Sequence, residues 1–136
     1  MFVPKKVKFR KQHKLMSAMH RPATQKTTVS YGSVGLKALE GGWITSRQIE
    51  AARRTIARSL KRGGKMWIRI FPDKSVTAHG NENTMGGGKG AVDYYVAVVR
   101  PGTVLFEMDG VTPEVSRAAL KMAGYKLPVT TRIVIR

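Results

Sequence analysis

The chain of 136 residues carries 25 Lys and Arg against 8 Asp and Glu, a net charge of +17 and a pI near 10.9. It has no cysteine for a disulfide or a thiolate metal site, and no apolar stretch approaches the ~20 residues of a membrane span. These totals predict one soluble, cytosolic domain that binds a polyanion. The charge is uneven, because residues 1–66 hold 16 basic and 2 acidic side chains and residues 67–136 hold 9 and 6.

Residues 3–14, "VPKKVKFRKQHK", form the densest run of cations. Its basic side chains are Lys5, Lys6, Lys8, Arg10, Lys11 and Lys14. Like charges at this density repel one another, which predicts an arm that becomes ordered on a phosphate backbone; a solvated tail is the alternative. The start lacks the apolar core of a secretory signal, and its many lysines, few serines and Pro4 disfavour an organelle transit peptide. Residues 15–26, broken by Pro22, are predicted to be loop.

The next segment, "TTVSYGSVGLKAL", favours a strand at Thr28, Val29 and Tyr31 that ends in a bend at Gly32 and Gly35. A helix then begins with Thr45 as N-cap and Gln48 three residues later, which is a capping box. Ile44 and Ile49 occupy the positions of a hydrophobic staple, and Gly63 is the predicted left-handed C-cap. The apolar stripe predicted to face the core is Ile49, Ala52, Ile56 and Leu60.

The opposite face of this helix is strongly basic. It carries Arg47, Arg54, Arg58 and Lys61, flanked by Arg53 and Arg62, with only Glu50 as a partner. An ordinary solvated helix mixes both signs of charge along its surface. This face is therefore predicted to meet phosphate, with a solvated surface as the alternative.

Further strands follow the first helix. In "KMWIRIF" the period of two places Met66, Ile68 and Ile70 on one side and Trp67, Arg69 and Phe71 on the other. Residues 75–79 are a candidate partner strand. Residues 92–99 and 103–109, joined at Pro101-Gly102, are predicted to form an antiparallel hairpin.

A second helix is predicted from Thr112, its N-cap, through Pro113 at the first helical position to Gly124. Its predicted buried stripe is Val115, Ala118, Ala119 and Met122. The chain ends in an alternating strand, "TTRIVIR". The expected fold class is α+β, a mixed and mostly antiparallel sheet covered by two helices. The expected organisation is an N-terminal arm and loop over 1–26 and a single domain over 27–136 with an extended loop at 75–91.

The glycine-rich stretch "NTMGGGKGAVDYYVAV" at 83–98 invites comparison with nucleotide-binding loops. A Walker A loop needs a glycine five residues before its Gly-Lys pair and a Ser or Thr after it, but Asn83 and Gly90 occupy these positions. The looser dinucleotide pattern needs a helix after the loop, and here a strand is predicted. We therefore predict that the glycines let the backbone approach a surface closely, while Lys89 neutralises one phosphate. A mobile connection without a partner is the alternative.

No catalytic or metal-binding constellation is evident. His13, His20 and His79 are scattered and lack ligand spacing, so surface or RNA-facing roles are predicted for them. Glu107 and Asp109 have no histidine near them in sequence, and no serine lies in a nucleophile elbow. No enzyme activity, metal or cofactor is predicted. A nucleic-acid-modifying enzyme and a DNA-compacting protein are the rival functions.

Several motifs in order resemble bacterial large-subunit ribosomal protein L-sixteen, a universal family with plastid and mitochondrial members. They are "PKKVKFRKQHK", "WITSRQIEAARR", "KMWIRIFPDK", "MGGGKG" and "VLFEMDGV". The resemblance implies a hammerhead-type α+β fold on large-subunit ribosomal RNA, near the aminoacyl-tRNA site, with incorporation late in subunit assembly. The implied partners are ribosomal RNA, aminoacyl- and peptidyl-tRNA and neighbouring ribosomal proteins, in a cytoplasmic or plastid ribosome and without a membrane.

With this resemblance, the residues predicted to bind RNA are Lys5, Lys6, Lys8, Arg10, Lys11, His13, Lys14, Arg47, Arg53, Arg54, Arg58, Lys61, Arg62 and Arg69. The residues predicted to lie near tRNA are Met85, Gly86, Gly87, Gly88, Lys89 and Gly90. Two departures from the family pattern limit this transfer. Thr84 replaces a basic residue before the loop methionine, and "LMSAMHRPATQ" replaces a Gly-Arg-rich segment, so the resemblance implies no contacts for residues 15–26.

Overall fold

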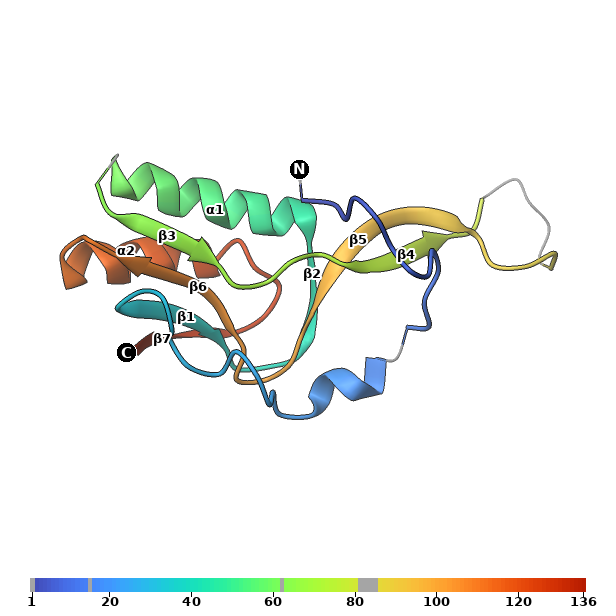
Figure 1. The fold of residues 1–136 in the computed structure, drawn as a ribbon, viewed down its shortest axis with the longest axis horizontal. Helices are drawn as coiled ribbons and strands as arrows, with labels where there is room; N and C mark the ends of the chain where they lie inside the picture. Colours follow the sequence, from blue (N-terminus) through green and yellow to red (C-terminus); the bar gives the residue numbers. More distant parts are fainter. Residues whose placement is uncertain (1, 15, 62, 81–85) are drawn as a thin grey trace.

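The computed structural model describes residues 2–14, 16–61, 63–80 and 86–136 and confirms the α+β class. Two helices accompany two antiparallel sheets (Figure 1). In chain order the elements are the 3₁₀ turn η1 (Met16–His20), β1 (Val34–Ala38), β2 (Gly42–Thr45), α1 (Ser46–Leu60), β3 (Lys65–Ile68), β4 (Lys74–Ala78), β5 (Ala91–Val99), β6 (Val104–Asp109), α2 (Pro113–Gly124) and β7 (Thr131–Ile135).

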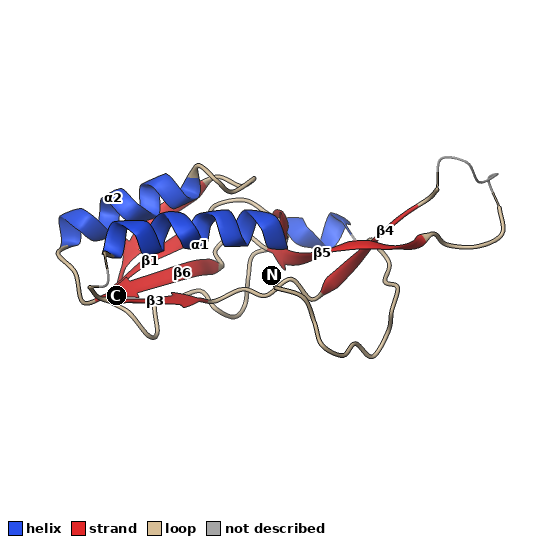
Figure 2. Cartoon of the chain, turned by 90° about the horizontal axis from the view of Figure 1, so that it is seen from above, coloured by secondary structure: helices blue, strands red, loops and turns tan. Residues whose placement is uncertain are grey.

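The two sheets occupy different parts of the molecule. The four-stranded sheet, in the order β3-β6-β1-β7, forms the body of the molecule, and α1 and α2 pack side by side on one of its faces (Figure 2). The three-stranded sheet, in the order β2-β5-β4, begins beside α1 and extends away from the body. Its outer part, the pair β4 and β5, is called the ribbon below. The ribbon carries the glycine-rich loop at its far end (Figure 1).

Most of the core lies between the helices and the inner face of the four-stranded sheet, and Ile44, Ala97 and Val99 of the three-stranded sheet complete it. Strand alternation places Val34, Leu36, Phe106 and Met108 on this inner face, where all four are buried. On α1 the predicted stripe is confirmed, with Ile49, Ala52 and Ile56 buried and Leu60 partly buried. Apolar side chains at helical spacing thus meet apolar side chains at strand spacing across one interface.

The predicted stripe of α2 is displaced by one position, and of its four residues Ala119 alone is buried. The buried residues are Ser116, Ala119, Leu120 and Ala123. Val115, Ala118 and Met122, which the prediction placed inside, are exposed. One position corresponds to about 100° of rotation, and this rotation brings Leu120 fully into the core. The small side chain of Ser116 fits the buried position that apolarity alone would not have selected.

Helix α1 begins as predicted but ends differently. Thr45 Oγ1 accepts from the Gln48 backbone N–H at 3.2 Å, and Gln48 Oε1 accepts from the Thr45 N–H at 2.9 Å, which confirms the capping box. The C-cap is Lys61, with φ 47° and ψ 45°, and not Gly63 as predicted. The left-handed turn therefore comes directly after Leu60, where a lysine has to adopt it.

The predicted hairpin between residues 92–99 and 103–109 is wrong. β5 pairs with β2 and β4, whereas β6 pairs with β1 and β3. The turn at Pro101-Gly102 is bonded to the end of β1 instead. Gly102 N donates to Ala38 O, and Ala38 N donates to Thr103 O, both at 2.8 Å. The chain thus crosses from one sheet to the other at this turn.

The strand predicted at residues 28–31 is also displaced, because β1 starts only at Val34. Residues 28–32 cross the outer face of the four-stranded sheet, the face that the helices leave open. Val29 is buried there, and a Cβ on Gly35 of β1 would lie 2.9 Å from Val29 Cγ2. The crossing segment therefore needs glycine at position 35.

Candidate nucleic-acid interface

The N-terminal arm, residues 2–14, lies against the body and the ribbon. It starts beside the first turn of α1 and runs across the ribbon (Figure 1). Phe2 packs against the core, and farther along Lys11 Nζ donates to Lys89 O at 2.8 Å. Lys89 Nζ in turn donates to Gln12 O. The arm is therefore attached to the base of the glycine-rich loop by a reciprocal pair of lysines.

The other cations of the arm point outward. The exposed ones are Lys5, Lys6, Lys8, Arg10 and Lys14, and the His13 side chain beside them is also exposed. None of these six side chains forms an ion pair or a hydrogen bond with another described residue. Lys8 Nζ lies 5.4 Å from the centre of the exposed Phe9 ring. These charges are free to bind an external anion.

A buried lysine of the ribbon, Lys74, also attaches the arm. Its side chain is buried at the start of β4, and Nζ donates to His13 O. Burial, followed by repulsion from Lys89, lowers the pKa of Lys74 against the opposing attraction of Asp73. The sequence did not single out Lys74, since one lysine after Pro72-Asp73 has no distinguishing pattern.

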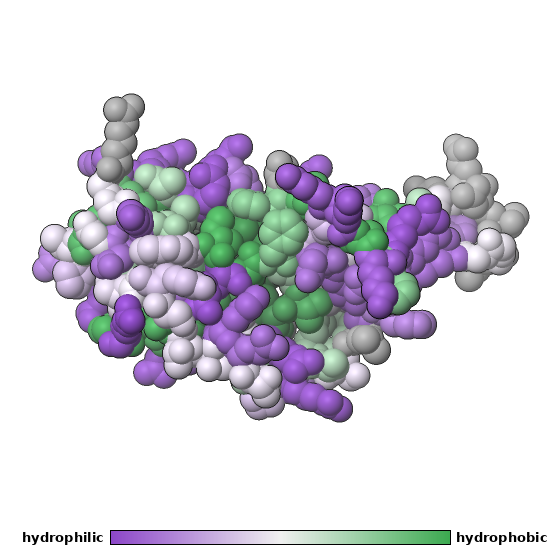
Figure 3. Space-filling view, viewed as in Figure 1, coloured by the Kyte–Doolittle hydropathy of each residue, from purple (hydrophilic) through white to green (hydrophobic). Residues whose placement is uncertain are grey.

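The outer face of α1 presents a second group of cations. Arg47, Arg54, Arg58 and Lys61 are exposed, and Arg62 lies outside the described residues. Figure 3 shows hydrophilic residues along the edge occupied by α1 and over the arm. The arm and this face are called the basic face below.

Glu50 is the one acidic residue of α1 (Ser46–Leu60), and two arginines form ion pairs with it. Arg53 Nη2 lies 2.5 Å and Arg54 Nε 3.0 Å from Glu50 Oε1. These hydrogen bonds, that of Arg53 first, lower the pKa of Glu50 to about 2 although desolvation opposes them. Arg53 is held more tightly, since Nε also donates to Glu50 Oε2 at 2.9 Å. Arg54 stays largely exposed and keeps its remaining donors.

Arg69 lies apart from the basic face. Its Nη1 atom is 2.5 Å from Glu107 Oε2, and its side chain is only 13% exposed. Glu107 is fully buried, and its Oε1 accepts from the backbone N–H groups of Ser30, Tyr31 and Gly32 at 2.7, 3.0 and 3.3 Å. The guanidinium therefore neutralises an internal carboxylate that fastens the crossing segment to the sheet. We leave Arg69 out of the proposed interface.

The described part of the glycine-rich loop starts at Gly86, so Met85 lies outside it. Gly86, Gly87 and Gly88 have φ of 110°, 83° and 103°, and a Cβ on any of them would meet no atom of the described residues within 4 Å. Gly90 differs, because a Cβ there would lie 2.3 Å from Ala78 O on the neighbouring strand. β4 occupies Lys74–Ala78, so the predicted loop at 75–91 is shorter, and its glycines divide into three open ones and one packed one.

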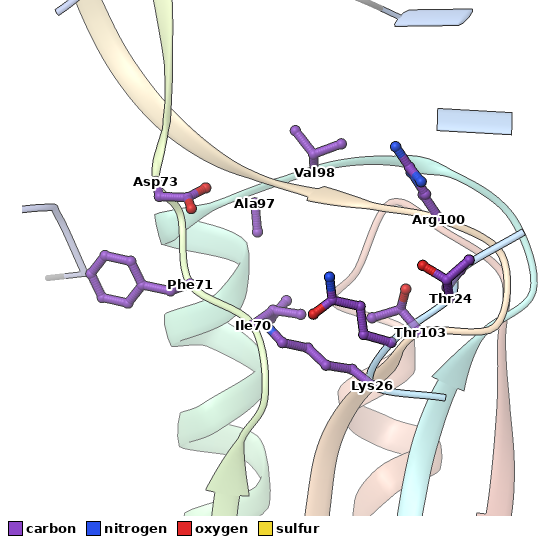
Figure 4. Close-up of a pocket in the computed structure, with 11 residues that line it drawn as sticks. Thr24, Lys26, Ile70, Phe71, Asp73, Ala97, Val98, Arg100 and Thr103 are labelled. Atoms are coloured by element: carbon purple, nitrogen blue, oxygen red, sulfur yellow. The ribbon is translucent and has the colours of Figure 1, made fainter. Parts of the chain in front are cut away.

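A hollow of about 400 Å³ lies between residues 23–26, 70–73 and 97–103 (Figure 4). Asp73 points into it, Ile70 and Ala97 form part of its wall, and Lys26 extends across it. Its lining contains one carboxylate, Asp73, and no histidine. The hollow marks the junction of the two sheets.

Among the described residues, no group of three or more histidines, cysteines or acids could hold a metal ion. His13, His20 and His79 are all exposed and lie on separate segments. The two α-helices, 15 and 12 residues long in the described part of the chain, are too short and polar to cross a membrane.

Fold and charge together define a small, strongly basic α+β protein. A family model described as Ribosomal protein L16p/L10e matches residues 4–134, so the chain belongs to this family. It is similar to the large ribosomal subunit protein uL16c of Thalassiosira pseudonana, with 58% identity over 136 residues that cover all of this chain and 98% of the relative. The uL16c of Porphyra purpurea is 52% identical, with coverage of 100% and 96%.

This membership confirms the resemblance noted in the sequence. The protein is a structural constituent of the large ribosomal subunit and not an enzyme. Its partners are accordingly ribosomal RNA and ribosomal proteins.

Proposed function

We propose that the chain binds large-subunit ribosomal RNA through its basic face. The residues proposed to contact RNA are Lys5, Lys6, Lys8, Arg10, Lys11, His13, Lys14, Arg47, Arg53, Arg54, Arg58, Lys61 and Arg62. The observation that carries the proposal is that the arm presents exposed, unpaired cations among the described residues. The segment that carries them is already attached to the ribbon by the hydrogen bonds of Lys11, Lys74 and Lys89. Because the arm is anchored, binding costs less ordering entropy than a free tail would require.

The loop at the end of the ribbon is proposed to face tRNA near the aminoacyl-tRNA site. Gly86, Gly87 and Gly88 have no described atom within 4 Å of where a Cβ would lie, so a nucleic-acid backbone can approach the main chain closely on that side. Lys89 and Gly90 connect the loop to the arm and to β4. Since the ribbon projects from the body, it is suited to extend beyond the RNA that the body contacts, toward aminoacyl- and peptidyl-tRNA. Met85 belongs to the proposal by its position in the sequence.

Two further proposals concern the setting. A protein that contacts several RNA segments by arm, helix and loop needs those segments to be folded first, which favours late incorporation into the subunit. The relatives are named uL16c, an ending that denotes chloroplast ribosomal proteins, and this favours a plastid ribosome over the cytoplasm that the sequence suggested. Detection of the chain in purified plastid ribosomes, against cytoplasmic ribosomes of the same cells, decides between the two.

The electrostatic proposal is tested by the salt dependence of binding to large-subunit RNA fragments. Neutralising about 6 to 10 phosphates weakens binding by roughly 10³ to 10⁵ between 50 and 200 mM salt. The combined variant Lys5→Ala, Lys6→Ala and Lys8→Ala should reduce the slope of log K against log salt by about three. Filter binding at five or six salt concentrations measures both slopes.

The matched control removes three cations from the other helix and the turn after it, by Arg117→Ala, Lys121→Ala and Lys126→Ala. These side chains are exposed but lie outside the basic face. The control should leave the slope nearly unchanged. A wild-type slope close to zero, or an equal loss of slope in both variants, would refute RNA binding by the basic face.

A further inference from the structure

The ring of Tyr31 lies on the outer face of the four-stranded sheet, away from the helices. It stacks on Trp67 with 6.3 Å between ring centres and 21° between planes. The guanidinium carbon of Arg69 lies 5.0 Å from the centre of the same ring. Trp67 and Arg69 are two residues apart, so their side chains point to the same side, and Tyr31 lies across both. Even so, the residue is 58% exposed.

The position of the ring is fixed in part by a hydrogen bond of the Tyr31 backbone. Tyr31 N donates to Glu107 Oε1 at 3.0 Å, while Arg69 binds Glu107 Oε2. One buried carboxylate thus fixes both the segment that carries the ring and the cation that lies against it. Packing of the core does not require the tyrosine to be held here, because Val29 already covers the sheet beneath the segment.

We propose that Tyr31 is a stacking platform for one unpaired nucleobase of ribosomal RNA. The inference rests on the proposed RNA binding and adds a site outside the basic face. Aromatic side chains that bind single-stranded RNA offer a flat, exposed ring face, and any base can stack on it. The guanidinium of Arg69 lies against the same ring and helps to fix its orientation, while its charge is neutralised by Glu107.

The neighbourhood fits a nucleotide better than an apolar protein segment. A hollow of about 380 Å³ borders Trp67 and is lined by Lys65 and the backbone of Gly64 and Gly110, with Asp109 as its one acid. Lys65 is exposed and lies two residues before Trp67, hence on the same side of β3. The lysine and the hollow thus adjoin Trp67, the residue on which Tyr31 stacks, and offer a cation and space beside a base bound there.

The test compares three substitutions at position 31 with a matched tyrosine. Tyr31→Ala and Tyr31→Leu both remove the aromatic face, and Leu retains an apolar contact with Trp67. Tyr31→Phe keeps the ring. Tyr125→Ala is the control, because Tyr125 is 67% exposed and has no ring or cation contact among the described residues. Affinity for large-subunit RNA fragments is measured over a range of salt concentrations, with urea unfolding of each variant alongside.

Loss of one stacked base should weaken binding about 5- to 150-fold in Tyr31→Ala and Tyr31→Leu, with the salt slope unchanged. Tyr31→Phe and Tyr125→Ala should bind as the wild type does. Wild-type affinity of the folded Leu variant overturns the platform, as does a loss in Tyr31→Phe equal to that in Tyr31→Ala. So does unchanged RNA affinity combined with poor incorporation into subunits, which would indicate a protein contact. A flat salt slope in the wild type would instead refute the basic face.

Discussion

Glu107 shows how much a single side chain decides in this chain. It is the fully buried acid of β6, between Phe106 and Met108 on the opposite face of the strand. The desolvation that burial imposes is the largest effect on its pKa, but the hydrogen bonds from Arg69 and from the backbone at Tyr31, Gly32 and Ser30 outweigh it. They lower the pKa of Glu107 below its ordinary value of 4.5.

Replacing this carboxylate tests its structural role. Glu107→Gln should reduce the free energy of unfolding by about 3 kcal/mol, because Arg69 would remain buried without its counter-charge and the amide cannot serve all four donors. Urea unfolding at neutral pH measures the loss. Asp93→Asn, at an exposed carboxylate without a hydrogen bond among the described residues, should change stability by less than about 0.5 kcal/mol. Equal effects of both substitutions would contradict the role of Glu107.

The free energies of unfolding of the wild type and of Glu107→Gln should also depend differently on pH in the acid range. Since the folded pKa of Glu107 lies below 4.5, the unfolded chain takes up its proton at a higher pH than the folded chain does. The stability from Glu107 is therefore complete above pH 4.5 and is lost as the pH falls through the folded pKa. The stability difference between wild type and Glu107→Gln should shrink below pH 4.5. Glu50, with a pKa of about 2, is present in both proteins and cancels from this difference.

At the scale of elements, local sequence predicted the starts of helices well and their ends poorly. The capping box of Thr45 and Gln48 and the N-cap Thr112 use hydrogen bonds between residues three apart, so the residues themselves define them. The end of α1 is different, because either Lys61 or Gly63 could make the left-handed turn. Local propensity favours glycine, yet Lys61 makes the turn, so the local sequence alone does not decide between them.

Lys61 therefore carries a backbone conformation that glycine adopts at lower cost. Lys61→Gly should raise the free energy of unfolding by about 0.5–1 kcal/mol, the left-handed strain relieved less the entropy cost of glycine. Lys61→Ala is the control, since it removes the same charge but keeps the strain. Thermal or urea unfolding distinguishes the two. If alanine stabilised the chain as much as glycine, removal of charge and not relief of strain would be the cause.

Tertiary pairing limited the prediction of the other elements in the same way. Apolarity and period two correctly predicted strands at β3, β4, β5, β6 and β7, but not which of them pair. Pro101-Gly102 fits a hairpin turn locally, yet its hydrogen bonds go to Ala38 of β1. Likewise the β-forming residues Thr28, Val29 and Tyr31 cross a sheet as a covering segment. The cations of the candidate site were predictable from charge, whereas the internal roles of Arg69 and Lys74 depend on burial that a single sequence does not show.

At the scale of the whole molecule, the separation into two sheets explains how a small protein can present the proposed loop contact at a distance from its core. The four-stranded sheet and the two helices form most of the core, joined by Ile44, Ala97 and Val99 of the three-stranded sheet, and the ribbon extends away from this body (Figure 2). Residues at the start of β5 are mostly exposed, while those at its end are mostly buried. Changes in the loop should therefore leave the core nearly unaffected.

This separation allows the proposed tRNA role of the loop to be tested without unfolding the protein. In Gly87→Val the new side chain meets no described atom within 4 Å of its Cβ, so the free energy of unfolding should change by less than about 1 kcal/mol. The φ of 83° is strained for valine, so the loop must change its path. Ribosomes reconstituted with this variant should bind aminoacyl-tRNA roughly tenfold more weakly, equivalent to ~1.4 kcal/mol.

The matched control is Gly102→Val, at a glycine that also has positive φ, 97°, and open space around it, but lies in the turn between the sheets. Strain at this site falls on the turn bonded to β1, so it should lower stability while leaving tRNA binding by assembled ribosomes as in the wild type. Equal tRNA binding by both variants would remove the loop from the tRNA site. Reduced tRNA binding in Gly87→Val alone, with the core intact, would show that the ribbon acts at its tip and the body only supports it.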